Sequence, residues 1–193
     1  MSEKDNTAET IQRLIQQRYS PVTFSSKEVE EEKLFQLFEA ARWAPSSFND
    51  QPWSFIYGRK GKDEIYDKLF DCLLEPNQMW AKYAPVLMLS IANMISPTTK
   101  KENRFAFHDT GMAVSNMLTQ ATSMDLYAHQ MGGYSKEQAI ETLNIPKTHL
   151  PVAMIAVGYK GNPKDFPKEL QEKGNKERTR KMLKDFVFNS EFL

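Results

Sequence analysis

Three short segments of this sequence carry polar side chains where an element of secondary structure is predicted to end. The first follows the first helical pattern and contains Arg18 and Ser20, the second spans 44–53, and the third contains Arg178 and Arg180. A guanidinium group binds a phosphate or carboxylate through two parallel hydrogen bonds, and a hydroxyl adds one donor. The amides of Asn and Gln both donate and accept hydrogen bonds. Taken singly, the segments also fit a helix end, a capped turn and a solvated run of charge.

The sequence lacks the motifs of several common enzyme and binding-protein classes. The sequence has no G-x-G-x-x-G turn for a dinucleotide, no G-x-S-x-G nucleophile elbow and no H-E-x-x-H zinc helix. Its three histidines are far apart in the chain, and Cys72 is its one cysteine. A disulfide framework within the chain and a cysteine-based zinc site are therefore excluded.

Length and charge narrow the class of protein further. The chain has 193 residues, 40% of them hydrophobic, with 25 basic and 25 acidic side chains that balance. This content supports a packed core, and the balance argues against a nucleic-acid binder, which would need a basic face. The longest apolar runs, 83–92 and 152–159, are too short to span a bilayer, and the first ten residues lack an apolar signal core. We therefore expect a soluble, cytoplasmic protein without a membrane partner.

The elements that must position the polar segments follow from hydrophobic periodicity. Helices are predicted over 8–17, from a capping box of Ser25 and Glu28 to Arg42, and over 62–74, 102–124 and 136–143. Strands are predicted over 53–57, 85–92, 126–131 and 152–159, and the second and fourth are apolar enough to be covered on both faces. The order indicates an α+β fold with helices over a sheet.

Two segments carry more apolar surface than one chain of this size is expected to hide. The pattern at 102–124 is apolar over most of its circumference, which places that helix at the centre of the fold or at a subunit interface. The chain ends with apolar residues between Phe186 and Leu193. Exposed aromatics at a free end would favour association, so we expect this tail to dock and the protein to form a homodimer.

Taken together, the polar segments resemble one known family. Residues 44–53 read Ala-Pro-Ser-Ser-Phe-Asn-Asp-Gln-Pro-Trp, which matches the pattern Ala-Pro-Ser-Ser-x-Asn-x-Gln-Pro-Trp of the nitroreductase family, the FMN-dependent α+β flavoproteins. Other matches in family order are Arg18 and Ser20 in an Arg-x-Ser segment, Asn77 before Trp80, Asp109 and Gly111, Gly132-Gly133-Tyr134, Gly158-Tyr159, and Arg178-x-Arg180. Val22 replaces the second basic residue of the opening motif. The resemblance covers nearly the whole chain. We therefore expect residues 1–193 to form a single FMN-binding domain.

The resemblance implies a mostly antiparallel central sheet flanked by helices, an intertwined homodimer, and tightly bound FMN. The FMN phosphate carries roughly −1.5 to −2 charges, like that of a phosphorylated side chain. The resemblance assigns it to Arg18 and Arg180, with Ser20 as a secondary donor. Arg178 is left open, because alternate side chains of an extended segment point to opposite sides.

The flavin ring is assigned by the same resemblance. It gives Asn49, Gln51 and Asn77 as amide partners, and Gly132 and Gly133 as positions where the backbone approaches N5 closely. In the family, Pro45, Ser46 and Ser47 come from the neighbouring subunit, so that each site is completed only in a dimer. The alternative is that the hydroxyls and amides of 45–51 satisfy local backbone groups only.

The activity implied is a ping-pong cycle, in which NAD(P)H is a transient co-substrate and a nitroaromatic, quinone or similar small molecule is the electron acceptor. No side chain is assigned as catalytic and no metal is expected, because the flavin carries the chemistry. Two alternatives stay open: a specialised flavin enzyme such as an enone reductase or dehalogenase, and a non-catalytic protein that stores or senses flavin. The sequence does not distinguish NADH from NADPH.

Overall fold

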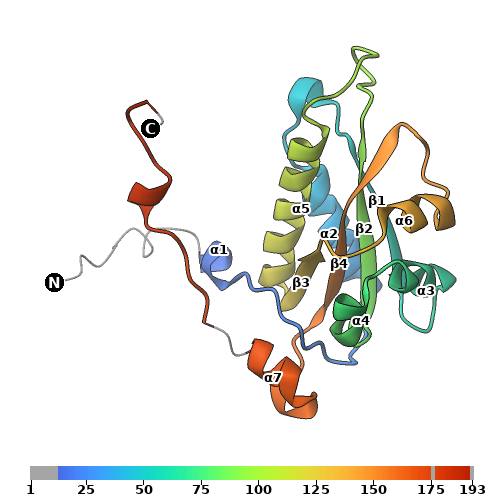
Figure 1. The fold of residues 1–193 in the computed structure, drawn as a ribbon, viewed down its shortest axis with the longest axis vertical. Helices are drawn as coiled ribbons and strands as arrows, with labels where there is room; N and C mark the ends of the chain where they lie inside the picture. Colours follow the sequence, from blue (N-terminus) through green and yellow to red (C-terminus); the bar gives the residue numbers. More distant parts are fainter. Residues whose placement is uncertain (1–12, 175–176, 192–193) are drawn as a thin grey trace.

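A computed structural model describes residues 13–174 and 177–191 (Figure 1). Four strands form one antiparallel sheet in the order β1-β2-β4-β3. They are β1 (Trp53–Arg59), β2 (Val86–Asn93), β3 (Leu126–Met131) and β4 (His149–Tyr159). All four strands were predicted, with β1 and β4 longer than expected. The predicted antiparallel sheet is confirmed.

Helices cover both faces of this sheet. They are α1 (Arg13–Gln17), α2 (Glu31–Arg42), α3 (Glu64–Asp71), α4 (Glu75–Ala81), α5 (Ala106–Ser123), α6 (Lys136–Thr142) and α7 (Lys168–Gly174). Helices α2 and α5 lie over one face, and α3, α4 and α6 lie over the other (Figure 1). Among the described residues, no helix is both long and apolar enough to cross a membrane.

Strand β2 shows why the apolar run at 85–92 had to be a covered strand. Leu87 and Leu89 point into the core beneath α3 and α4, while Val86 and Met88 point into the core beneath α2 and α5. Alternate side chains of a strand face opposite ways, so an all-apolar strand needs a partner layer on each side. The two helical layers provide that cover.

The predicted start of the second helix at Ser25 is wrong. The Ser25 N–H donates to the Tyr159 carbonyl, and Phe24 pairs with Lys160, so this segment adds a short bridge at the end of β4. The Ser25 hydroxyl accepts from the Lys27 N–H only, and α2 begins at Glu31. The third predicted helix, 62–74, is shortened to α3, and the short helices α4 and α7 were not predicted.

The long helix is buried on part of its circumference. Helix α5 begins at Ala106, later than expected, and buries Ala113, Met117 and Ala121 against α2 and the sheet. Phe105 and Phe107, at its start, are exposed. The part of the first predicted helix before Arg13 and the last two residues of the tail lie outside the described residues.

The C-terminal tail is exposed along its described length. Every described residue from 177 to 191 is exposed, including Phe186, Val187 and Phe188. In Figure 1 the tail and α1 lie to one side of the helices and sheet.

Candidate functional site

Three guanidinium groups gather after α1, although they come from opposite ends of the chain. The Arg18 Nη1 donates to the Ser20 hydroxyl over 3.0 Å. Burial, together with the charges of Arg180 and Arg178, lowers the pKa of Arg18 below its usual range. None of the three arginines forms an ion pair with a carboxylate in the described part of the chain. Such a cluster of uncompensated positive charge suits a dianionic phosphate.

The two C-terminal arginines have different partners. Arg178 donates from Nη1 to the Arg18 carbonyl over 2.7 Å and from Nη2 to the Gln16 carbonyl over 2.9 Å. These bonds tie the tail to the end of α1. Among the described residues, Arg180 donates to the carbonyl of its neighbour Thr179 alone. Arg178 therefore positions the segment. Arg180 makes fewer hydrogen bonds, so more of its N–H groups are available to a ligand.

A half-buried histidine joins this cluster to the next group of residues. His129, on β3, places Nδ1 2.8 Å from the Pro21 carbonyl and stacks on Trp80 with ring centroids 4.5 Å apart. Burial lowers the pKa of His129; the charge of Arg18 acts in the same direction, and the bond to Pro21 opposes them. The lowered pKa favours the neutral form of the imidazole ring, which lies between the two groups.

The second group surrounds the end of β3. Asn77, on α4, donates from Nδ2 to the Gly133 carbonyl over 2.9 Å, and its Oδ1 accepts from Trp80 Nε1 over 3.3 Å. A Cβ at Gly133 would lie 2.7 Å from that Nδ2, so a side chain there would force Asn77 to move. A Cβ at Gly132 would have no neighbour within 4 Å, so this backbone has an open side. Asn77 thus shapes the glycine loop and keeps one N–H donor and one acceptor lone pair for another partner.

The turn before β1 is held by a strained backbone and a buried carboxylate. Phe48, Asn49 and Gln51 have φ values of 54°, 56° and 46°, the left-handed region that residues other than glycine rarely adopt. The Ser47 N–H donates over 2.9 Å to Oδ2 of Asp109, a buried residue in the first turn of α5. Strain of this kind gathers at functional sites.

Part of the polar surface of the turn is used locally. The Ser46 hydroxyl accepts from the Gln51 N–H, and Gln51 Nε2 donates to the Asn49 carbonyl. Within one chain, the side chains of Ser46 and Gln51 therefore bond to backbone groups of the same turn, as the alternative interpretation of 45–51 expects. Ser47 and Asn49 make no side-chain hydrogen bond to another described residue.

Within one chain the turn and the arginine cluster lie apart. The turn contacts the first turn of α5, whereas α4 lies toward the other end of α5 and α1, which precedes the cluster, lies to one side (Figure 1). The structure thus brings together two of the predicted groups, Arg18 with Ser20 and the C-terminal arginines, and Asn77 with the two glycines. It separates Pro45, Ser46, Ser47, Asn49 and Gln51 from both.

Sequence reasoning missed the residues that connect these groups. His129 was interpreted as an ordinary surface or capping histidine, and Asp109 was noted only as a family match. Their partners, the Pro21 carbonyl and the Ser47 N–H, are backbone atoms 108 and 62 residues away. The hydrophobic pattern contains no signal for such contacts. No group of three potential metal-binding side chains occurs among the described residues.

Comparison with known proteins gives one consistent result. The nitroreductase family model matches residues 15–159. A putative NADH dehydrogenase/NAD(P)H nitroreductase of Methanothermobacter thermautotrophicus is 29% identical over 149 residues, which cover 75% of this chain and 74% of the relative. An FMN reductase [NAD(P)H] of Bacillus subtilis is 26% identical over 71% of this chain and 60% of its own length.

Solved structures agree with the sequence comparison. The crystal structure of an oxidoreductase containing FMN superimposes with a TM-score of 0.89 at 32% identity, covering 100% of this chain and 96% of the other. A putative nitroreductase from Desulfovibrio desulfuricans in complex with FMN shares the fold, with a TM-score of 0.72 at 24% identity and 100% coverage of both chains.

Proposed function

The chain belongs to the nitroreductase family and is an oxidoreductase that uses FMN and NAD(P)H, and we propose that it passes electrons to a nitroaromatic, quinone or similar small acceptor. FMN, when bound, would supply the redox chemistry between NAD(P)H and the acceptor, and the chain's own residues would hold and orient it. The two substrates use one face in turn, in a ping-pong cycle. A nicotinamide that visits briefly needs no Rossmann motif, and the sequence has none.

The observation that carries this proposal is the arginine cluster. Arg18 and Arg180 are assigned to the FMN phosphate, with Ser20 as a further donor and Arg178 as the residue that holds the segment in place. Val22 occupies the position of the family's second basic residue. It is half-buried against the hydrophobic core and offers no charge to a phosphate. The phosphate therefore depends on arginines from both ends of the chain.

The flavin ring is proposed to lie near the glycine loop. The open side of Gly132 lets a backbone N–H approach the ring, while Asn77 keeps Gly133 in place. A donor held against N5 stabilises charge as hydride arrives. This loop should therefore affect the rate as well as the binding of flavin.

We further propose that two copies of the chain share each site. Phe105, Phe107, Phe186 and Val187 expose apolar surface that a second copy would cover. In such a homodimer Pro45, Ser46, Ser47, Asn49 and Gln51 of one chain reach the FMN held by Arg18 of the other. Residues 1–193 then act as one FMN-binding domain per chain.

Two measurements on the purified holoprotein test this function. The flavin released by denaturation should be FMN, and anaerobic NAD(P)H oxidation should depend on added quinone or nitroaromatic. A protein that releases FMN but does not oxidise NAD(P)H with any acceptor would be a flavin store or sensor. Turnover confined to an enone or a halogenated aromatic would indicate a specialised reductase.

A further inference from the structure

A cavity of about 690 Å³ lies where β1 ends and β2 begins, and no residue assigned to FMN lines it. Phe24, Tyr83, Pro85 and Phe166 give it an apolar lining. The rings of Tyr83 and Phe166 meet edge to face, with centroids 5.0 Å apart. This volume is in the range of sites that take small organic ligands, and ring edges and faces suit an aromatic group.

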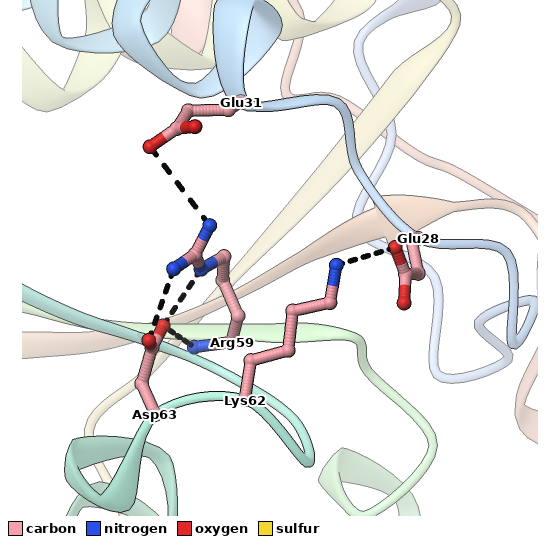
Figure 2. Close-up of polar contacts among 5 residues, drawn as sticks. All are labelled: Glu28, Glu31, Arg59, Lys62 and Asp63. Atoms are coloured by element: carbon pink, nitrogen blue, oxygen red, sulfur yellow. Dashed lines mark hydrogen bonds and ion pairs between the residues drawn. The ribbon is translucent and has the colours of Figure 1, made fainter.

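Two of the basic side chains at this cavity are already neutralised (Figure 2). Arg59 donates from Nε and Nη2 to the Asp63 carboxylate over 2.7 and 3.0 Å. Its Nη1 also lies 3.9 Å from a Glu31 oxygen. Lys62 Nζ lies 2.7 Å from Glu28 Oε2, so this pair joins the turn after β1 to the segment before α2.

Two other basic side chains keep an uncompensated charge. Lys60 Nζ donates to the Lys82 carbonyl, and Lys160 Nζ lies 5.4 Å from the centroid of the Tyr19 ring. Neither ammonium group is ion-paired with a carboxylate among the described residues. The lining has two carboxylates. Glu28 is paired with Lys62, and Asp165 forms no ion pair with a described residue. The lining itself holds four basic side chains and two acidic ones, Glu28 and Asp165.

We propose that this cavity binds an anionic aromatic molecule, an aromatic carboxylate or sulfonate, at a site separate from the flavin. The ring lies against Phe24, Tyr83 and Phe166, and the anionic group lies near Lys60 and Lys160. The apolar lining and the excess of basic over acidic side chains favour such a ligand over a neutral ring.

The site adjoins the segment that carries the arginine cluster. Tyr19 packs between Lys160 and Arg178, whose guanidinium lies 5.9 Å from the centroid of the same ring. Phe24 stacks on Trp80, which stacks in turn on His129. A ligand that draws Lys160 away from Tyr19 therefore changes the surroundings of Arg178. This second part rests on the proposed function, whereas ligand binding itself does not.

The test uses 1-naphthoate as the probe and 1-naphthamide as its neutral counterpart, with binding to the holoprotein measured by calorimetry. Wild type should bind naphthoate more tightly than naphthamide. Replacing both lysines (Lys60→Gln with Lys160→Gln) should weaken naphthoate about three- to tenfold, the range expected for exposed ion pairs, and leave naphthamide unchanged. Lys68→Gln, an exposed lysine on α3 away from the lining, is the matched control and should change neither.

A second variant tests the cavity without touching its charges. Ser26 is an exposed lining residue, so Ser26→Trp should fill the cavity while the chain still folds. It should abolish naphthoate binding and the change that naphthoate causes in the flavin absorbance. Equal naphthoate affinity in wild type, the double lysine variant and Ser26→Trp would overturn the proposal, since the probe would then bind elsewhere, the flavin face included. Absence of binding to wild type would overturn it too. Binding that follows these variants in a protein without FMN would leave the site standing and refute only the proposed function.

Discussion

The arginine cluster makes a prediction about a single residue. Hydrogen bonds to charged groups contribute about 1.5–3 kcal/mol each, so Arg18→Ala should weaken FMN binding roughly ten- to a hundredfold. Riboflavin lacks the phosphate and should lose little affinity. Titration of the apoprotein with both flavins measures the difference. Equal losses for FMN and riboflavin would mean that Arg18 acts through folding.

The two neighbouring glycines give a matched pair. A Cβ at Gly132 meets no atom within 4 Å, so Gly132→Ala should leave the melting temperature of the apoprotein unchanged and weaken flavin binding. Gly133→Ala places a Cβ 2.7 Å from Asn77 Nδ2 and should lower the melting temperature as well. Normal flavin affinity in Gly132→Ala would show that the flavin ring does not lie against this loop.

His129 links stability to pH. Its pKa is lowered in the folded protein, chiefly by burial, from an unfolded value of about 6.5. Its contribution to stability is therefore fully present above that value and is lost as pH falls through the folded pKa. The apoprotein should lose less free energy of unfolding between pH 7.5 and pH 5 in His129→Gln than in wild type. Urea unfolding at equal protein concentration tests this, and identical losses would contradict it.

At the scale of elements, the prediction concerns the contact between α5 and the turn. Asp109→Ala leaves the Ser47 N–H without its acceptor, which should cost about 1–3 kcal/mol of stability and weaken FMN binding. Asp109→Asn keeps an oxygen acceptor and should restore most of both. Unfolding and flavin titration of the two variants provide the measurement. Full FMN affinity in a destabilised Asp109→Ala would show that the turn does not contact flavin.

The sequence predicted elements where burial alone determines them. The apolar runs around Met88 and Ile155 had to be covered strands, and both are. Ser25 was misassigned because its backbone pairs with Tyr159, a contact that local capping rules cannot show. Helix α4 was missed because it is short and has a proline in its first turn. The contact of Arg178 with the Arg18 carbonyl spans 160 residues, so the difference between Arg178 and Arg180 required the fold.

If two chains share each site, two differently defective chains should form a dimer with one intact site. Light scattering of the holoprotein should give twice the mass of the chain, because the exposed tail and turn need a partner. In a heterodimer of an Asn49→Ala chain with an Arg18→Ala chain, one site carries both changes and the other carries neither. About half of its sites should then bind FMN normally. Impairment of every site would place Arg18 and Asn49 in one chain's site.

The central claim is that the chain transfers electrons from NAD(P)H to a small acceptor through FMN in two separable steps. Anaerobic rapid mixing tests it most directly, by following the visible absorbance of the bound flavin. Addition of NAD(P)H without acceptor should bleach that band, and a quinone added after removal of the nicotinamide should restore it. A band that persists with NADH and with NADPH, while FMN stays bound, would contradict the account.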